Sequence, residues 1–254
     1  MDARQARQEI ASALVAAGLR PGGAVLVHSS LRSLGYVPGG PETVVQGLLE
    51  ALGTQGTLLM PALSYAFVDA ARPLFDVRHT PSCVGAIPEH FRTRSGTLRS
   101  VNPTHSVCGV GPAAAEMLAG HILDETPCGP HSPYRRLRDR GGQILFLGCG
   151  LRPNTSMHAV EELVVPPYLF GSVVRYRVIL ADGREIAMSC RRHDFSSWRQ
   201  RYDRLAALLG EDGLRTGKVL AATVHIVECR VMWERALAAL RQDPFAFVEP
   251  KPQP

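Results

Sequence analysis

The stretch QILFLGCG, residues 143–150, is followed a few residues later by NTSMHAVEE, residues 154–162. The first stretch is short and almost wholly apolar, which is typical of a strand that is buried on both faces of a sheet. The second is typical of the first turns of a helix, which Thr155 or Ser156 can cap. A buried strand that leads into a helix is the unit from which α/β folds are built.

The same alternation covers the chain on the N-terminal side of this stretch. Short apolar runs predict buried strands at 22–30 and 56–61. Amphipathic patterns, with proline at helix starts and glycine at helix ends, predict further helices. These predicted helices lie at 1–17, 41–52, 84–94, 111–121 and 132–140. Strands that are almost continuously apolar and alternate with helices favour an α/β layered fold.

The pattern changes after Val165. Residues 173–190 predict two strands joined at Asp182-Gly183, a dipeptide that strongly favours a hairpin turn. The remaining predicted elements are helices at 197–209 and 229–241 and a frayed tail from about residue 248. Because no linker rich in Pro, Gly or Ser separates these parts and no repeat is visible, we expect one domain over residues 1–254 with an antiparallel C-terminal extension.

The composition narrows the class of protein. The 254 residues are 45% hydrophobic and have a net charge of +5, so the chain can bury a sizeable core. No apolar run approaches the roughly 20 residues of a membrane span, and the N-terminus lacks the features of a signal peptide. The six cysteines form no C-x-x-C pair, so we expect reduced thiols in a cytoplasmic protein.

The positive charge comes from dispersed arginines without a recognisable nucleic-acid-binding signature. We therefore expect neither a nucleic-acid partner nor a membrane partner. A polyanionic small molecule would make better use of this charge.

His158 and Glu161 stand three residues apart, so they share one face of the predicted helix. A carboxylate beside an imidazole fixes its tautomer and raises its basicity, which a general base requires. The same spacing is also found at ordinary helix starts, where glutamates interact with the helix dipole. The spacing alone therefore leaves both interpretations open, together with half of a metal site.

Two other segments have features of a site. The loop HSSLRSLG, residues 28–35, follows a predicted strand, and its backbone N–H groups and hydroxyls could hold a phosphate, although its serines could equally be turn formers. Cys149 ends another strand, so an amidase with Cys149 as nucleophile and His158 as base is an alternative, against a thiol that only fills space.

A metal site would combine His158 and Glu161 with a distant ligand such as His105, His193 or His225. The sequence has no H-E-x-x-H motif and no second close pair of ligands. We therefore expect a protein without a bound metal.

Taken together and in order, these segments resemble the aminoglycoside 3-N-acetyltransferase family, the antibiotic N-acetyltransferase type that is distinct from the GNAT fold. The matching segments are VHSSLRSLGYVPGGPETVVQGLLEALG with QGTLLMP, TPSCVGAIPEHFR, NPTHSVCGVGPAA, HSPYRRL, GGQILFLGCG, and NTSMHAVEE with VPPY behind it. The resemblance extends from about residue 8 to residue 247, and the ordered combination is specific although each piece is not.

The resemblance implies a three-layer α/β/α sandwich and acetyl-CoA as the acetyl donor. It implies that His158 is the catalytic base and Glu161 its partner carboxylate, within a T-x-x-H-x-x-E motif that begins at Thr155. Thr155 or Ser106 could stabilise the oxyanion. The residues implied to lie along the cofactor are His28, Ser29, Ser30, Leu31, Arg32, Ser33, Leu34, Gly35, Thr104, Ser106 and Val107.

The acceptor side departs from the family pattern. Members that modify aminoglycosides often have an aspartate where this chain has Arg152, and they tend to be acidic where this chain has Arg191 and Arg192. Because an aminoglycoside is a polycation, arginines in the acceptor cleft would repel it. We therefore expect an acetyltransferase that acts on a small-molecule amine, either an aminoglycoside or another amine, as a monomer or homodimer. The candidate acceptor-binding residues are Tyr65, Asp124, Glu162 and Asp194, and Glu125 could supply further negative charge.

Overall fold

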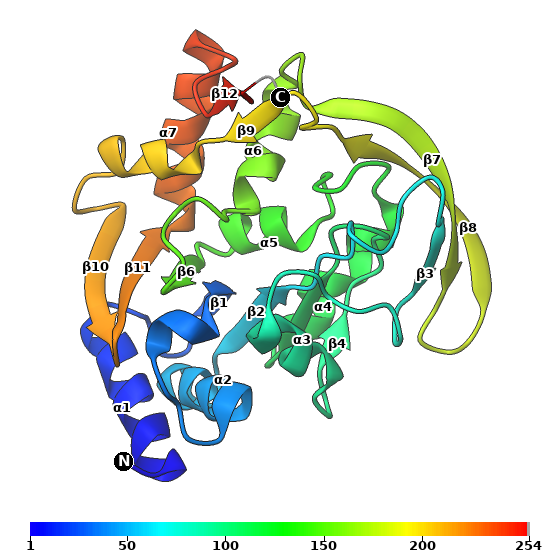
Figure 1. The fold of residues 1–254 in the computed structure, drawn as a ribbon. Helices are drawn as coiled ribbons and strands as arrows, with labels where there is room; N and C mark the ends of the chain where they lie inside the picture. Colours follow the sequence, from blue (N-terminus) through cyan, green and yellow to red (C-terminus); the bar gives the residue numbers. More distant parts are fainter. Residues whose placement is uncertain (253–254) are drawn as a thin grey trace.

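The computed structural model describes residues 1–252, which contain a mixed sheet of seven strands in the order β10-β11-β6-β1-β2-β5-β4 (Figure 1). Its centre consists of three parallel neighbours, β1 (Ala24–Ser29), β2 (Thr57–Pro61) and β6 (Gln143–Leu147). Almost every residue of these strands is buried. The strands predicted from apolar runs are therefore confirmed, and their composition follows from cover on both faces.

Antiparallel strands flank this centre on both sides. They are β5 (Val107–Val110) and β4 (Leu98–Arg99) beyond β2, and β11 (Ala222–Glu228) and β10 (Leu214–Val219) beyond β6. Ser29 at the end of β1 pairs with Leu147 at the end of β6, so the two strands end side by side. Ligand sites of open α/β sheets are commonly found at such carboxyl ends.

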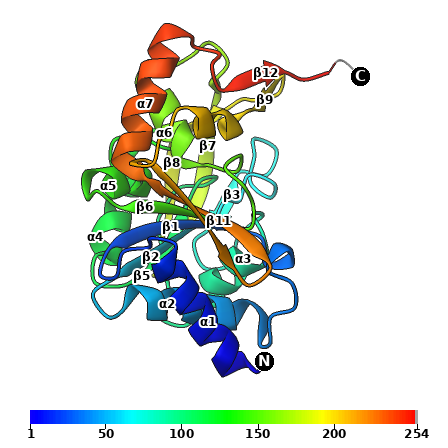
Figure 2. The same ribbon diagram turned by 90° about the vertical axis from the view of Figure 1, so that its left-hand side faces the viewer.

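Helices cover the two faces of the sheet (Figure 2). The helices that pack in the first hydrophobic cluster are α1 (Ala3–Ala16), α2 (Gly40–Leu52) and α3 (Ala86–Thr93). Those in the second cluster are α4 (Ala114–Ala119), α5 (Pro133–Asp139), α6 (Ser156–Val164) and α7 (Cys229–Gln242). In β6, Leu145 contributes to the first cluster and Phe146 to the second, as expected for a strand whose successive side chains point to opposite faces.

A smaller sheet contains β3 (Leu74–Asp76), β7 (Phe170–Ile179) and β8 (Glu185–His193). β7 and β8 are antiparallel and are joined by the turn that contains Gly183, whose φ of +86° suits the left-handed conformation of a tight hairpin. The predicted hairpin is therefore confirmed. It forms the long curved arm of Figure 1, and its last residue, His193, lies beside the site described below.

The C-terminal region corrects two predictions. Residues 197–209 do not form an α-helix, because β9 (Trp198–Gln200) is followed by the 3₁₀ helix η3 (Tyr202–Ala207). The tail is ordered in its first residues, because β12 (Val248–Pro250) pairs antiparallel with β9 and Glu249 bonds to Arg199 and Arg201. The two errors have one cause, since each strand needs a partner about fifty residues away. The fraying predicted for residues 253–254 falls outside the described residues.

Two further 3₁₀ helices are present, η1 (Leu31–Leu34) and η2 (Gly120–Leu123). η2 continues directly from α4, so the helix predicted at 111–121 is in fact a short α-helix that tightens at its end. Within residues 1–252, no helix combines the length and the apolar character that crossing a membrane requires.

Candidate active site

A cavity of about 530 Å³ opens at the carboxyl ends of β1 and β6. His28 and Ser29 line it from the end of β1, and Cys149 lines it from the loop after β6. The opposite walls come from the N-terminal turn of α6, the end of β8 and the β9–η3 segment. Its volume is in the range of pockets that bury small molecules.

His158 projects into this cavity from α6 and is held from behind by Glu161. The Nδ1 atom of His158 lies 3.0 Å from Oε2 of Glu161, and the Glu161 side chain has no exposed surface. A carboxylate at this distance fixes the imidazole tautomer in which Nδ1 carries the proton. The other ring nitrogen, Nε2, then carries the lone pair and can accept a proton from a ligand in the cavity.

Two tyrosines complete the surroundings of the buried carboxylate. Tyr168 donates a hydrogen bond of 2.8 Å to Oε1 of Glu161, and Tyr202 donates one of 2.8 Å to Oε2. The Tyr202 hydroxyl also lies 3.0 Å from Nδ1 of His158. Burial beside Glu161 raises the pKa of both phenols, so they remain hydrogen-bond donors. Three donors thereby compensate the desolvation of one buried carboxylate.

The start of α6 differs from the prediction in one respect. Thr155 occupies the N-cap position, but its side chain caps no backbone N–H group, so the predicted cap by Thr155 or Ser156 is wrong. Thr155 lines the cavity instead. The side-chain oxygens of Asn154 and Ser156 are buried without a hydrogen-bond partner within residues 1–252. Of these two residues only Asn154 lines the cavity, so its oxygen is one that a ligand could satisfy.

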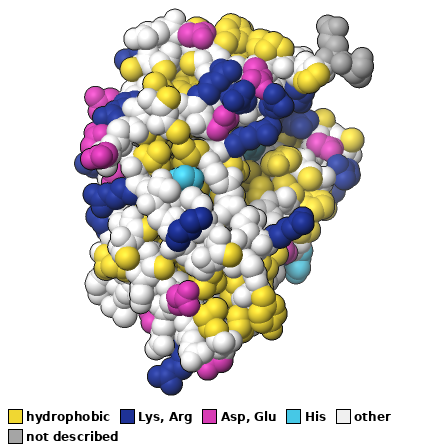
Figure 3. All heavy atoms as spheres, turned by 60° about the vertical axis from the view of Figure 1, so that its left-hand side comes forward, with side chains coloured by type: hydrophobic (Ala, Val, Ile, Leu, Met, Phe, Trp, Pro, Cys, Tyr) yellow, Lys and Arg dark blue, Asp and Glu magenta, His cyan; other side chains and the backbone are white. Residues whose placement is uncertain are grey.

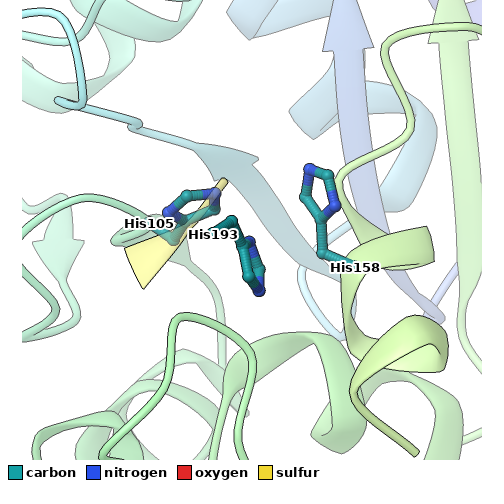
Figure 4. A group of neighbouring side chains, drawn as sticks. All are labelled: His105, His158 and His193. Carbon is teal, nitrogen blue, oxygen red and sulfur yellow. The ribbon is translucent and has the colours of Figure 1, made fainter. Parts of the chain in front are cut away.

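Two more histidines lie next to His158 (Figure 4). His105 comes from the loop before β5 and His193 from the end of β8, and both line the cavity. Burial holds the pKa of each imidazole well below its usual range, and nearby cationic groups lower it further. His225 does not join them, because it lies on β11 beside Thr216.

The loop at residues 28–35 is only partly in the cavity. His28 and Ser29 line it, whereas Ser30, Leu31, Arg32, Ser33, Leu34 and Gly35 lead away through η1. Gly148 adopts φ +74°, and a Cβ atom there would lie 2.7 Å from Ser33, so this glycine allows the end of β6 to approach the loop closely. Burial lowers the pKa of His28 to about 3, and its Nε2 atom is buried without a partner in the part of the chain that the structure describes.

The stretch from Thr104 to Val107 contributes His105 to the cavity lining, rather than the predicted Thr104, Ser106 or Val107. Thr104, Ser106 and Val107 are buried outside the cavity lining, and only His105 between them lines it. Ser106 donates to the carbonyl oxygen of Ala62 and accepts from Arg99, so its hydroxyl is already engaged. Of the two predicted oxyanion donors, Thr155 lines the cavity and Ser106 does not.

Of the predicted acceptor-binding residues, only Tyr65 lines the cavity. Asp124 is buried against His131, and Asp194 is exposed and accepts from the backbone N–H of Ser196. Glu162 lies behind His193, where Thr126 and the backbone N–H of Cys128 also bond to its carboxylate. The placement of Asp124, Asp194 and Glu162 therefore corrects the prediction that they contact the acceptor.

The charge lining the cavity is positive. Arg152 and Arg192 line it, while the lining within residues 1–252 includes no aspartate or glutamate. Arg191 points away, because its guanidinium lies over the Phe170 ring and donates to the carbonyl oxygen of Gly171. Lys and Arg side chains also gather in the upper part of the face shown in Figure 3. Near the cavity, Arg199 and Arg201 of the β9–η3 segment both pair with Glu249.

Cys149 lines the cavity, but its chemistry is unsuited to nucleophilic attack. Burial raises the pKa of its thiol to about 12. A catalytic cysteine requires the thiolate, which depends on a lowered pKa. A buried thiol of this kind therefore does not support the alternative of an amidase with Cys149 as nucleophile.

A sequence profile described as "Aminoglycoside 3-N-acetyltransferase" matches residues 26–241 of the chain. The chain belongs to this family. It is therefore an acyltransferase, as the order of its motifs predicted. The aminoglycoside N(3)-acetyltransferase VII of Streptomyces paromomycinus is 34% identical over 256 aligned residues, which cover 88% of this chain and 87% of the relative.

Solved structures agree with this membership of the aminoglycoside 3-N-acetyltransferase family. The structure described as AAC-IIIb binary with CoASH superposes with a TM-score of 0.82 at 27% identity, covering 97% of this chain and 98% of that one. The structure described as AAC-VIa bound to sisomicin gives a TM-score of 0.79 at 26% identity, covering 93% of this chain and 97% of that one. The mixed α/β class predicted from the sequence is thereby confirmed.

Several residues of this acetyltransferase site escaped the sequence analysis. Tyr202 was placed on a predicted helix, and Tyr168 appeared only as part of VPPY. His105 and His193 were considered only as distant metal ligands. Periodicity carries no signal for such residues, because long-range strand pairing brings them to the site. The one local hint is the histidine close to a phenylalanine in RRHDF, residues 191–195.

Proposed function

We propose that this acyltransferase moves the acetyl group of acetyl-CoA to an amine within a ternary complex, with His158 as general base and Glu161 as its partner. The proposal rests on the different surroundings of the two nitrogens of the His158 ring. Nδ1 lies 3.0 Å from the fully buried carboxylate of Glu161, while Nε2 is left to contact a ligand in the cavity. An ordinary helix start would not bury Glu161 or surround it with two tyrosine hydroxyls.

The chemistry follows from this arrangement. A protonated amine has no lone pair, so His158 Nε2 first takes a proton from it. The freed amine attacks the thioester carbonyl carbon, and the C–S bond breaks after a tetrahedral intermediate. The proton on His158 can then pass to the departing sulfur, and the amide nitrogen loses its remaining extra proton to the vacated Nε2 and from there to solvent. Glu161 stabilises the imidazolium in the interval, and Thr155 is positioned to stabilise the oxyanion.

The donor is proposed to be acetyl-CoA. The related AAC-IIIb has been solved with CoASH. Within residues 1–252, the buried Oγ of Ser29 at the cavity wall has no hydrogen-bond partner, so it is available for a ligand. The exposed Arg32 of η1 could meet a phosphate of the cofactor.

The first candidate acceptor is the 3-amino group of an aminoglycoside. It rests on relatives whose descriptions state this activity and on AAC-VIa, which has been solved with sisomicin. The second candidate is an amine of lower positive charge. A specific observation favours it, because Arg152 and Arg192 line the cavity and no carboxylate does so within the described chain. Two positive charges would repel a polycation and attract an acceptor that carries an acidic group.

We also propose the overall architecture, the location and the partners of this protein. The two hydrophobic clusters on opposite faces of the central sheet support a three-layer α/β/α sandwich. A single domain over residues 1–254, a cytoplasmic location, a monomer or homodimer, and the lack of a nucleic-acid or membrane partner stay predictions.

The proposal is tested by measuring thiol release from acetyl-CoA in the presence of a panel of amines. The panel should contain aminoglycosides of different charge number, neutral amines and amines that carry a carboxylate. Thiol release that depends on the amine, with formation of the acetylated product, is the expected result. If no amine stimulates release, or if acetyl-CoA is hydrolysed equally without one, the proposed transfer is wrong. The amine with the highest kcat/KM separates the two candidate acceptors.

A further inference from the structure

Three imidazoles, those of His105, His158 and His193, face one another across the end of the cavity. Their ring centroids are 5.7 Å, 5.1 Å and 4.8 Å apart. One ring nitrogen of each lies within 4.8 Å of the other two. Figure 4 shows them approaching a common space from three separate segments of the chain. Three imidazole nitrogens that meet in this way are a suitable set of ligands for a transition-metal ion.

Each imidazole has one nitrogen engaged on its outer side. Nδ1 of His158 is held by Glu161, and Nε2 of His193 lies 2.8 Å from Oε1 of Glu162. Nδ1 of His105 lies 2.9 Å from the hydroxyl of Thr104. Histidines that bind metals have this arrangement, in which an oxygen acceptor fixes the tautomer and orients the ring.

In the part of the chain that the structure describes, the other ring nitrogen of each histidine makes no hydrogen bond. Nδ1 of His193 is the clearest case, because this atom is buried and has no partner within residues 1–252. The His193 side chain is only 4% exposed. A buried polar atom without a partner is unfavourable, and a bound ion would satisfy it.

We propose that His105, His158 and His193 form a site for a divalent transition-metal ion such as zinc. The ion would take Nε2 of His105, Nε2 of His158 and Nδ1 of His193, with its fourth position open to the cavity. Tetrahedral zinc with bonds of about 2.0–2.1 Å needs its nitrogens about 3.3 Å apart. One nitrogen of each ring lies within 4.8 Å of the others, so rotation of the side chains must bring the three ligand nitrogens closer together. This site departs from the expectation of a protein without a metal, and Glu161 serves as an outer partner in it rather than as a ligand.

The site has a consequence for catalysis, which rests on the proposed function. The metal and the acceptor amine need the same atom, Nε2 of His158. An ion held there would remove the general base, so metal binding should inhibit acetyl transfer. Metal binding itself does not depend on that function, and it can be measured without acetyl-CoA.

The binding experiment uses Co²⁺ as the probe and the full chain after removal of metals by a chelator. A 1:1 complex with the visible absorption of four-coordinate Co²⁺, displaced by Zn²⁺, is expected. Loss of a ligand in His105→Ala or His193→Ala should weaken Co²⁺ binding by more than the about 10–100-fold that loss of an outer partner costs. Glu162→Gln, which changes an outer partner, should fall in that smaller range.

A matched control is His79→Ala. His79 is also a histidine beside a carboxylate, 2.9 Å from Asp76, but it is exposed and lies outside the cluster. This variant should bind Co²⁺ as the parent does. The proposal is overturned if the parent chain takes up no Co²⁺ at micromolar concentrations, or if uptake persists unchanged in both cluster variants. The spectrum of the parent chain decides the matter even if a variant fails to fold.

The catalytic consequence is tested separately, with the amine that gives the highest turnover. Added Zn²⁺ should inhibit transfer, and a chelator should restore it. If Co²⁺ binds with the expected spectrum while Zn²⁺ leaves turnover unchanged, the claim that the ion blocks His158 is wrong. If Co²⁺ binds but no amine is acetylated even without metal, the proposed function has failed and the metal site has not.

Discussion

The two sides of the cavity are built by different means. On the α6 side, His158 and Glu161 are three residues apart and bond within one turn of helix. In a second part of the lining, which we call the C-terminal wall, Arg192, His193 and Tyr202 come from β8 and η3. The bond from Tyr202 to Glu161 spans 41 residues of sequence. The α6 side therefore holds the proposed base, whereas the C-terminal wall contacts that residue and its partner carboxylate and lines the adjoining space.

The largest effect is expected from the α6 side. His158→Ala removes the atom that takes the proton, so kcat should fall by about 10²–10⁴. Binding of coenzyme A should stay within a few fold of the parent, because the ring is not proposed to hold the cofactor. Steady-state kinetics and calorimetry with coenzyme A measure the two quantities.

His225→Ala is the matched control, since this histidine lies on β11 outside the cavity lining. It should behave like the parent chain. Near-normal turnover of His158→Ala at neutral pH would remove His158 from the mechanism. The residues of the C-terminal wall would then have no base to position.

Glu161→Gln should have the next largest effect. Glutamine keeps the shape of the side chain but removes the charge that stabilises the imidazolium during transfer. Loss of such an outer partner lowers activity by about 10–100-fold in other sites, so kcat should fall by that amount and less than in His158→Ala. Steady-state kinetics at saturating acetyl-CoA give the comparison. A variant as inactive as His158→Ala would mean that Glu161 does more than orient and polarise the ring.

Tyr202→Phe tests whether the C-terminal wall acts through the α6 side. The variant removes one hydroxyl that donates to Glu161, while the bond from Tyr168 remains. A hydrogen bond to a charged group contributes about 1.5–3 kcal/mol, and part of this is retained by the neighbouring donors. We expect a loss in kcat of about tenfold or less, since 1.4 kcal/mol corresponds to tenfold.

The KM for the acceptor should change little in Tyr202→Phe, because the hydroxyl faces the carboxylate. The free energy of unfolding, measured by denaturant titration, should fall in parallel. A changed KM with an unchanged kcat would show that Tyr202 contacts the acceptor directly.

The same contrast explains how much the sequence could predict. The central strands, the helices around them and the β7–β8 hairpin follow from apolar runs, helix periodicity and one Asp-Gly turn, which are local signals. The pair of His158 and Glu161 is also local, although its spacing did not distinguish a base from a helix start. The family resemblance favoured the general base over the ordinary helix start, and the burial of Glu161 supports that choice.

The C-terminal wall could not be predicted in this way. Residues 197–209 have the composition of a helix, yet pairing of β9 with β12 imposes a strand and a 3₁₀ turn. That pairing places Tyr202 against Glu161. The acidic residues Asp124 and Asp194 were predicted from charge alone, which carries no information on direction, and both face elsewhere.

Replacement of the cavity arginines should have a smaller effect, confined to the acceptor. Arg192→Ala lies on the C-terminal wall and Arg152→Ala lies on the α6 side. Exposed like-charge contacts are weakened by solvent and salt, so we expect the KM for a polycationic amine to fall by a few fold in each variant and by about tenfold in the double variant. Arg191→Ala is the control, since its guanidinium lies over Phe170.

The expected change should shrink at high salt, because the Debye length falls from about 10 Å at 0.1 M to about 3 Å at 1 M. Kinetics with aminoglycosides of increasing charge measure it. If Arg191→Ala changes the KM as much as the other two variants, the charge of the whole molecule, rather than the cavity, controls acceptor choice.

The smallest effect is expected at Cys149, which lines the cavity from the loop after β6 but takes no part in the proposed chemistry. With a pKa of about 12, its thiol is protonated throughout the neutral range. Cys149→Ala should therefore keep turnover within about twofold, as expected for a small thiol that fills space. Alkylation of Cys149 by iodoacetamide, followed by peptide mass spectrometry, should be slow at pH 7.5. Since only the thiolate reacts, the rate should rise about tenfold per pH unit well beyond pH 9, where an ordinary thiol with a pKa of about 8.5 has levelled off. A rate that levels off near pH 8, or an acyl-Cys149 adduct trapped with acetyl-CoA, would restore the nucleophilic role and would place a second reactive group beside His158.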